Sequence, residues 1–149
     1  MNSPFRLFRA VAVAEAITWA LLLFGMFLKY VTETTELGVR VFGMVHGVVF
    51  VAYVVVAVLV AIDQKWGIGR TALAVVAAVP PFATLLLEWW AVRRTWIGEQ
   101  WRLRSAVPSG PLESAAGWVL RQPVRGALVG VAAVVVLTGA ALVVGPPTS

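Results

Sequence analysis

Three ionisable side chains lie inside long apolar stretches of this sequence: Glu15, His46 and Glu88. A carboxyl or an imidazole can bind and release a proton, so these residue types could relay protons or pair with one another. Glu15 most needs an explanation, because an apolar side chain would cost less at this position. If its stretch crosses a bilayer, the charge costs about 3 kcal/mol, and the helix usually turns such a group towards protein or water.

The composition indicates that these stretches do cross a membrane. Of the 149 residues, 60% are hydrophobic and 13% are charged, whereas ordinary soluble domains are about 25% charged. A chain this short has too little interior to bury so much apolar surface in water. Its net charge of +5 is typical of headgroup contact beside apolar spans, so we expect no nucleic-acid partner.

Hydropathy and length predict an all-α protein with four membrane-spanning helices in one domain, residues 1–149. A helix of about 20 residues crosses the roughly 30 Å hydrocarbon layer, and only a helix satisfies its own backbone hydrogen bonds in lipid. The predicted spans are residues 7–28, 41–62, 71–90 and 124–144.

Two features modify this four-helix prediction. Pro80 and Pro81 interrupt the third span and remove two amide donors, so we expect a kink there. Tryptophans and arginines then alternate through residues 91–105, which predicts a short amphipathic segment along the headgroups. The arginines expected to contact anionic headgroups are Arg93, Arg94, Arg102 and Arg104.

Helical spacing groups the polar residues into a candidate intramembrane site. Thr18 and Trp19 share a helix face with Glu15, and Tyr53 lies two turns beyond His46. From the rise per residue, His46 and Glu88 fall at a similar depth, which permits a hydrogen bond or ion pair between them, whereas Glu15 falls in the opposite leaflet. The candidate site is Glu15, Thr18, Trp19, His46, Tyr53 and Glu88.

Each of these features also has a purely structural interpretation. A lone intramembrane histidine commonly makes a structural hydrogen bond, and Glu88 lies close enough to Arg93 or Arg94 to pair with one of them. One histidine cannot supply both axial ligands of a haem, and the chain has no cysteine, so we expect no cofactor and no metal. Glycine pairs four residues apart allow close helix packing, within the chain or in a homodimer or with a membrane-protein partner. These are Gly43 with Gly47 and Gly126 with Gly130.

The distribution of basic residues gives an orientation for four spans. Eight lysines and arginines fall on the side of the first and third loops, and four on the side of both termini. Cytoplasmic loops are enriched in these residues, so this count places both termini outside.

The collected motifs resemble those of the YdzA-like small bacterial integral membrane proteins, over roughly residues 5–94. The resemblance implies a bacterial plasma membrane location and singles out the two Glu positions and the His position, but it implies no reaction. Its family typically has three spans, so the fourth span lies outside it. The residues that carry the resemblance are Phe5, Arg6, Glu15, Ala16, Thr18, Trp19, Lys29, Tyr30, His46, Gly47, Phe50, Tyr53, Pro81, Phe82, Glu88 and Trp89.

Two functions remain open from the sequence. The first is a non-catalytic membrane component or accessory subunit, whose buried polar groups define helix pairing. The second is a proton-coupled small-molecule transporter in which Glu15 titrates and the proline kink forms a bendable wall. The Ala14–Glu15 pair is similar to small multidrug exporters in the first span only. A membrane enzyme has the least support, because we find no nucleophile with a base, no metal cluster and no phosphate-binding loop.

Overall fold

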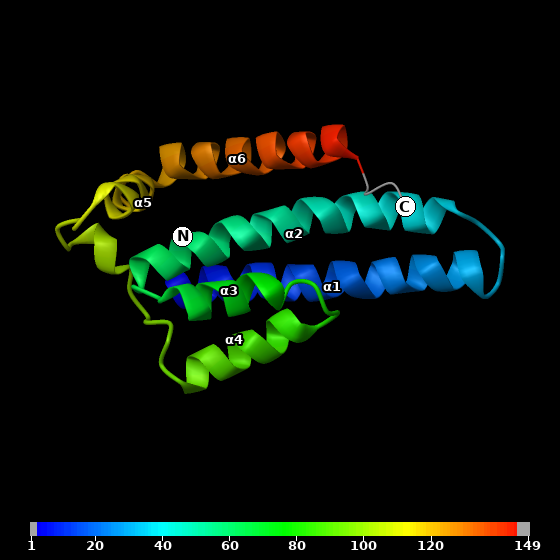
Figure 1. The fold of residues 1–149 in the computed structure, drawn as a ribbon, viewed down its shortest axis with the longest axis horizontal. Coiled ribbons are helices and arrows are strands. Elements are labelled where there is room, and N and C mark those ends of the chain that lie inside the picture. The colour runs from blue at the N-terminus through cyan, green and yellow to red at the C-terminus, as the bar shows by residue number, and fades with distance from the viewer. Residues whose placement is uncertain (1–2, 146–149) are drawn as a thin grey trace.

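The computed structural model describes residues 3–145, which are entirely helix, turn and loop. Helices α1 (Pro4–Tyr30) and α2 (Leu37–Asp63) form a long antiparallel pair (Figure 1). Ser3 caps the first turn of α1 by accepting a hydrogen bond from the Arg6 amide at 3.1 Å, and Pro4 fits the first helical position. The two backbones come closest at Gly25 and Gly38, where a Cβ on Gly25 would lie 2.7 Å from the Gly38 carbonyl carbon.

The predicted third span is two short helices, α3 (Ile68–Val76) and α4 (Ala83–Arg93), that run in opposite directions (Figure 1). Pro80 and Pro81 cannot donate backbone hydrogen bonds, and Phe82 adopts a left-handed conformation with φ 64°, so the chain reverses instead of kinking. We call residues 68–93 the hairpin.

The hairpin begins and ends on one side of the molecule. The Trp66 Nε1 donates a hydrogen bond to the Trp96 carbonyl at 2.8 Å, which ties the segment before α3 to the segment after α4. At 1.5 Å per residue, the nine residues of α3 extend about 14 Å, close to half of the roughly 30 Å hydrocarbon layer. The hairpin therefore has the dimensions of a re-entrant element.

Three helices of the described chain are long and apolar enough to cross a membrane: α1, α2 and α6 (Pro123–Val144). The prediction of four spans is thus not confirmed, although α6 coincides with the predicted fourth span. The starts of α1 and of the hairpin lie at one end of the molecule, and α6 runs from that end towards the end that holds the connection between α1 and α2 (Figure 1). The expectation that both termini share a side depended on four spans and is not confirmed either.

The segment predicted to be amphipathic, residues 91–105, is mainly loop, with one 3₁₀ turn, η1 (Arg102–Arg104). The amphipathic helix comes later, as α5 (Pro111–Arg121), and Gln122 joins it to α6. A Cβ on Gly126 would overlap the Val119 carbonyl, so this glycine permits the sharp turn between α5 and α6.

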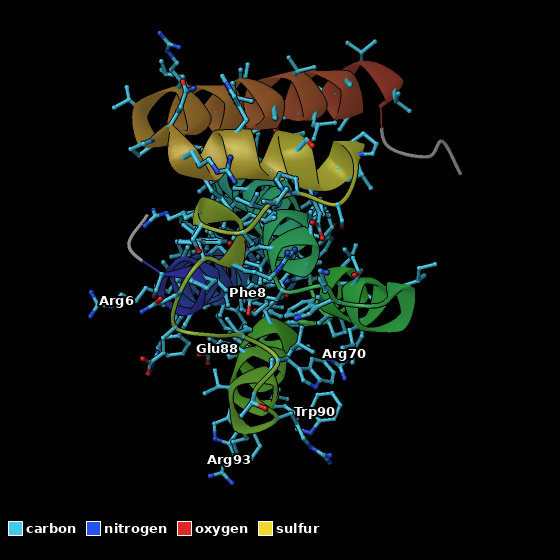
Figure 2. The ribbon with its side chains drawn as sticks, turned by 90° about the vertical axis from the view of Figure 1, so that its left-hand side faces the viewer. Arg6, Phe8, Arg70, Glu88, Trp90 and Arg93 are labelled. Carbon is cyan, nitrogen blue, oxygen red and sulfur yellow. The ribbon has the colours of Figure 1, made fainter. Side chains whose placement is uncertain are left out.

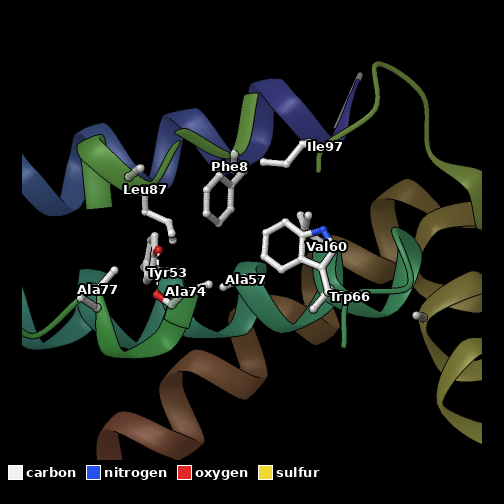
Figure 3. Close-up of a cluster of buried hydrophobic side chains, with 14 of the residues drawn as sticks. Phe8, Tyr53, Ala57, Val60, Trp66, Ala74, Ala77, Leu87 and Ile97 are labelled. Atoms are coloured by element: carbon white, nitrogen blue, oxygen red, sulfur yellow. Dashed lines mark hydrogen bonds between the residues drawn. The ribbon is translucent and has the colours of Figure 1, made fainter. Parts of the chain in front are cut away.

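An aromatic core joins the helix pair to the hairpin (Figure 3). The ring of Phe8 lies 5.7 Å from that of Tyr53 and 6.0 Å from that of Trp66, within the range of favourable aromatic pairs. Leu87 of α4 and Ala74 of α3 pack around them. Because Phe8 is fully buried among residues of α1, α2 and the hairpin, this core defines where the hairpin docks.

Asp63, at the end of α2, binds the chain that follows the hairpin. Its carboxylate accepts hydrogen bonds from the amides of Leu103 at 2.8 Å and Arg102 at 3.1 Å, and from the side chain of Gln64. Arg102 donates to the Asp63 carbonyl at 2.6 Å and pairs with Glu113 of α5 at 2.8 Å. Arg102 therefore binds within the protein, in place of the headgroup contact predicted for it, because the last carbonyls of α2 need donors.

The expected topology can be read out by single-cysteine labelling, since the natural chain has no cysteine. We expect Lys65→Cys and Glu99→Cys to react with a membrane-impermeant maleimide from the same side of sealed vesicles, and Glu33→Cys from the other. All three positions are exposed. Labelling of Glu99→Cys from the side of Glu33→Cys would support four spans and contradict the hairpin.

Glu113 should make stability pH-dependent at the acidic end. The Ser109 amide and the Arg102 guanidinium lower the pKa of Glu113 from its usual 4.5 to about 2. A lowered folded-state pKa stabilises the fold above pH 4.5, and this contribution disappears as the pH falls from about 4.5 towards 2. We expect Glu113→Gln to make the unfolding midpoint of detergent-solubilised protein less dependent on pH across this window. Glu99→Gln is the matched control, and an equal loss of pH dependence in both variants would refute the assignment.

Candidate functional site

The candidate site lies where α1 faces the start of α4. Buried residues of α1 recur at Phe8, Ala12, Glu15 and Ala16, one face of a helix, so Glu15 points into the protein and is fully buried. Thr84, in the first turn of α4, donates a hydrogen bond to Glu15 Oε2 at 2.7 Å and also lies 3.3 Å from the Ala12 carbonyl. The hairpin thereby supplies the polar partner of the carboxyl group.

The second carboxyl oxygen of Glu15 is different. Oε1 is buried and has no hydrogen-bond partner within residues 3–145. A buried oxygen without a partner costs free energy, so such an atom in a folded protein calls for a reason. The arrangement leaves one oxygen of this carboxyl held by Thr84 and the other open to a proton or a small donor.

Thr18 links Glu15 to His46. The Thr18 hydroxyl lies 2.9 Å from the Glu15 carbonyl and 3.0 Å from His46 Nδ1. A hydroxyl has a single proton, so both contacts are satisfied when Thr18 donates to the carbonyl and Nδ1–H of His46 donates to Thr18. The imidazole also packs on Trp19, with ring centroids 4.6 Å apart. His46 therefore contacts the face of α1 that bears Glu15. The depth estimate from the sequence had placed His46 and Glu15 in different leaflets.

Trp19 and Tyr53 bond to carbonyls near the end of α3. Trp19 Nε1 donates to the Ala78 carbonyl at 3.3 Å, and the Tyr53 hydroxyl donates to the Ala74 carbonyl at 2.9 Å. The helical ladder breaks here, since the Ala78 amide bonds to Val75 in place of Ala74. These two side chains thus satisfy backbone groups that the proline break leaves without helical partners.

Glu88 lies apart from His46. It shares the buried face of α4 with Thr84, Leu87 and Ala91, one turn closer than Thr84 to the open end of the hairpin (Figure 2). Within the described chain no hydrogen bond or ion pair joins Glu88 to His46 or to Arg93. The reversal at Phe82 brings Glu88 back towards the start of α1, because α4 does not continue across the membrane.

Two residues outside the predicted site have large roles in the structure. Thr84 bonds to Glu15, and a hydroxyl three residues after a proline pair in an apolar stretch was its sequence signal. Asp63 anchors the later loop, and its signal was an acidic residue at the very end of an apolar span. Residues 3–145 contain no cluster of three His, Asp or Glu side chains that could hold a metal ion.

The long apolar helices and the polar contacts between them define an integral membrane protein. Residues 5–93 match a family model described as "Domain of unknown function (DUF3817)", and the chain belongs to this family. The match covers α1, α2 and the hairpin, so these elements are the family unit. It supports a membrane protein family without confirming the YdzA-like name.

One curated relative is "Putative membrane protein SCO5905" of Streptomyces coelicolor, 59% identical over 91 residues. The match covers 60% of this chain and 11% of that protein, so the chain spans about a tenth of the relative's length. No solved structure matches this chain.

The contact between Thr84 and Glu15 is testable by a matched pair of variants. We expect Thr84→Val to lower the free energy of unfolding by roughly 1–3 kcal/mol, because it leaves the Glu15 carboxyl without its donor. Thr138→Val is the control, since the buried Thr138 hydroxyl has no hydrogen-bond partner in the described residues. The measurement is the unfolding midpoint in detergent, and equal midpoints for the two variants would count against the contact.

Proposed function

We propose that this protein is a non-catalytic accessory component of the bacterial plasma membrane, with the whole chain acting as one membrane domain. The observation that carries the proposal is how the candidate site uses its polar groups. Thr84 holds Glu15, while Trp19 and Tyr53 hold backbone carbonyls of the hairpin. Each contact joins one helix to another, so the polar side chains maintain the fold.

The relative from Streptomyces coelicolor supports an accessory role. Its matched segment makes up 11% of a much longer membrane protein, so a closely similar unit exists covalently joined to other parts. In the present chain, α6 offers the surface for an equivalent non-covalent contact. Most of its side chains are exposed, including Val135 at 64% and Leu128 at 65%.

Of the four paired glycines, two pack against other residues of the chain and two face open space. Gly126 packs against Val119, and Gly43 lies near Leu22, whereas a Cβ on Gly47 or Gly130 would meet nothing within 4 Å. The homodimer or membrane-protein contact proposed from the sequence therefore involves Gly47 and Gly130. Small residues at these positions let a second helix approach closely.

The hairpin also changes the proposed orientation. With three spans, ten of the twelve lysines and arginines lie at the end of the molecule that holds the start of α1, and only Lys29 and Arg40 lie at the other. This asymmetry favours a cytoplasmic N-terminus and an external C-terminus. Arg93, Arg94 and Arg104 then face the anionic headgroups of the cytoplasmic leaflet. The ten are Arg6, Arg9, Lys65, Arg70, Arg93, Arg94, Arg102, Arg104, Arg121 and Arg125.

A proton-coupled transporter is the second candidate, and one observation favours it. Glu15 Oε1 is buried without a hydrogen-bond partner in residues 3–145, and ionisable residues inside membrane spans commonly belong to proton paths. Thr18, which bonds to the backbone carbonyl of Glu15, also contacts His46, so a second ionisable side chain lies within one helical turn of Glu15 along α1.

Reconstitution separates the two functions. For an accessory component, we expect purified protein in vesicles with a pH gradient to show the proton flux of empty vesicles, with Glu15→Gln unchanged. A flux that Glu15→Gln abolishes would establish the transporter and overturn the accessory role.

Photo-crosslinking from the lipid-facing surface tests the contact itself. We expect a photoreactive residue at Val135 of α6 to give one discrete crosslinked product in native membranes, either a second copy or one membrane protein. The control is Ile17 of α1, which is 56% exposed. Absence of a discrete product at Val135, or the same products at both positions, would contradict the proposal.

A further inference from the structure

An apolar groove lies between the two arms of the hairpin. Its volume is about 530 Å³, and its lining is almost wholly apolar. Leu73 and Val76 form the α3 side, Leu86 and Trp90 the α4 side, and Pro80 closes the tip. In water such a surface would be unfavourable, whereas at membrane depth it fits hydrocarbon.

Cationic side chains surround the open end of this groove. The Arg70 guanidinium lies 4.7 Å from the ring centroid of Trp96, and that of Arg94 lies 5.5 Å from the ring centroid of Trp90. The two tryptophan rings contact each other edge to face at 4.6 Å. Figure 2 shows Arg70 and Trp90 beside each other at the ends of α3 and α4. Stacking on these rings holds both guanidinium groups near the mouth.

Within residues 3–145, neither of these arginines pairs with a carboxylate. The ion pairs Lys29–Glu36 and Arg102–Glu113 involve neither Arg70 nor Arg94. Two positive groups thus remain for an anion at the mouth of an apolar groove. A guanidinium binds phosphate oxygens by charge-assisted hydrogen bonds.

We propose that the hairpin binds one anionic phospholipid, with an acyl chain in the groove between α3 and α4 and its phosphate at Arg70 and Arg94. This proposal rests on the headgroup contact stated under the proposed function, and it names the site and the ligand of that contact. The α3 arm beside the groove is about 14 Å long, which matches the depth of one leaflet.

The two arginines at the mouth favour an anionic lipid over a helix as the occupant. A helix with its side chains is about 10–12 Å across. A single extended hydrocarbon chain is thinner and needs no polar lining. Lipid that merely surrounds the protein would also contact the convex faces of α1 and α6, whereas this groove joins a concave apolar wall to two arginines.

Native mass spectrometry of the full-length protein tests the site. Protein is equilibrated with vesicles of equal phosphatidylglycerol and phosphatidylcholine, then released and its bound lipid identified. We expect wild type to retain one phosphatidylglycerol. In the double variant Arg70→Gln with Arg94→Gln, the preference for phosphatidylglycerol over phosphatidylcholine should fall about tenfold, since each arginine near anionic lipid contributes to binding. Arg6→Gln, another exposed arginine at the same end, should keep it.

A matched pair of valines tests the groove itself. Val76 lines the groove and is 60% exposed, whereas Val79 is 62% exposed and lies outside the lining. We expect Val76→Trp to fill the groove and lose the retained lipid, and Val79→Trp to keep it. Equal retention by both tryptophan variants, or an equal loss of preference in Arg6→Gln, would overturn the site. Neither outcome would alter crosslinking from Val135, so the accessory role is tested separately.

Discussion

The backbone break at Pro80 and Pro81 is the constraint on which this structure depends. A helix interrupted at membrane depth leaves carbonyl groups without donors, and hydrocarbon offers none. Here Tyr53 of α2 bonds to Ala74, and Trp19 of α1 bonds to Ala78. The helix pair therefore stabilises a hairpin that could not exist alone in lipid. The hairpin in turn supplies Thr84, whose hydroxyl bonds to the buried Glu15 carboxyl.

This exchange of hydrogen bonds explains why polar residues persist in such an apolar chain. Thr84 joins the hairpin to the Glu15 carboxyl of α1, and Thr18, one turn further along α1, contacts His46 of α2. All of them lie within the family unit of residues 5–93. The unit is thus two spans and a hairpin joined by polar contacts, while α5 and α6 are attached beyond it through Asp63, Arg102 and Glu113.

The hairpin also gives the two ends of the molecule different chemistry. It returns α4, with its tryptophans and arginines, to the end that already holds the start of α1. The open end of the hairpin therefore combines aromatic rings, guanidinium groups and an apolar groove. An end of this kind suits contact with anionic lipid, and the exposed length of α6 suits contact with another membrane helix. The first of these properties follows from a chain reversal of six residues, 77–82.

Composition and apolar length alone determined that this is a helical membrane protein with long helices near residues 7–28, 41–62 and 124–144, because hydropathy and length depend only on local sequence. The same reasoning located the break at Pro80 but predicted a kink, since proline chemistry by itself does not distinguish a bend from a reversal. Only the tertiary structure decided that question. The chain reverses at Phe82, which has a left-handed backbone conformation. A hydrogen bond then joins Trp66 to Trp96, and Thr84 contacts Glu15, 69 positions earlier in the sequence. Helix direction follows from such long-range contacts, so the sequence could place Glu15, His46 and Glu88 along their helices but could not say which of them meet.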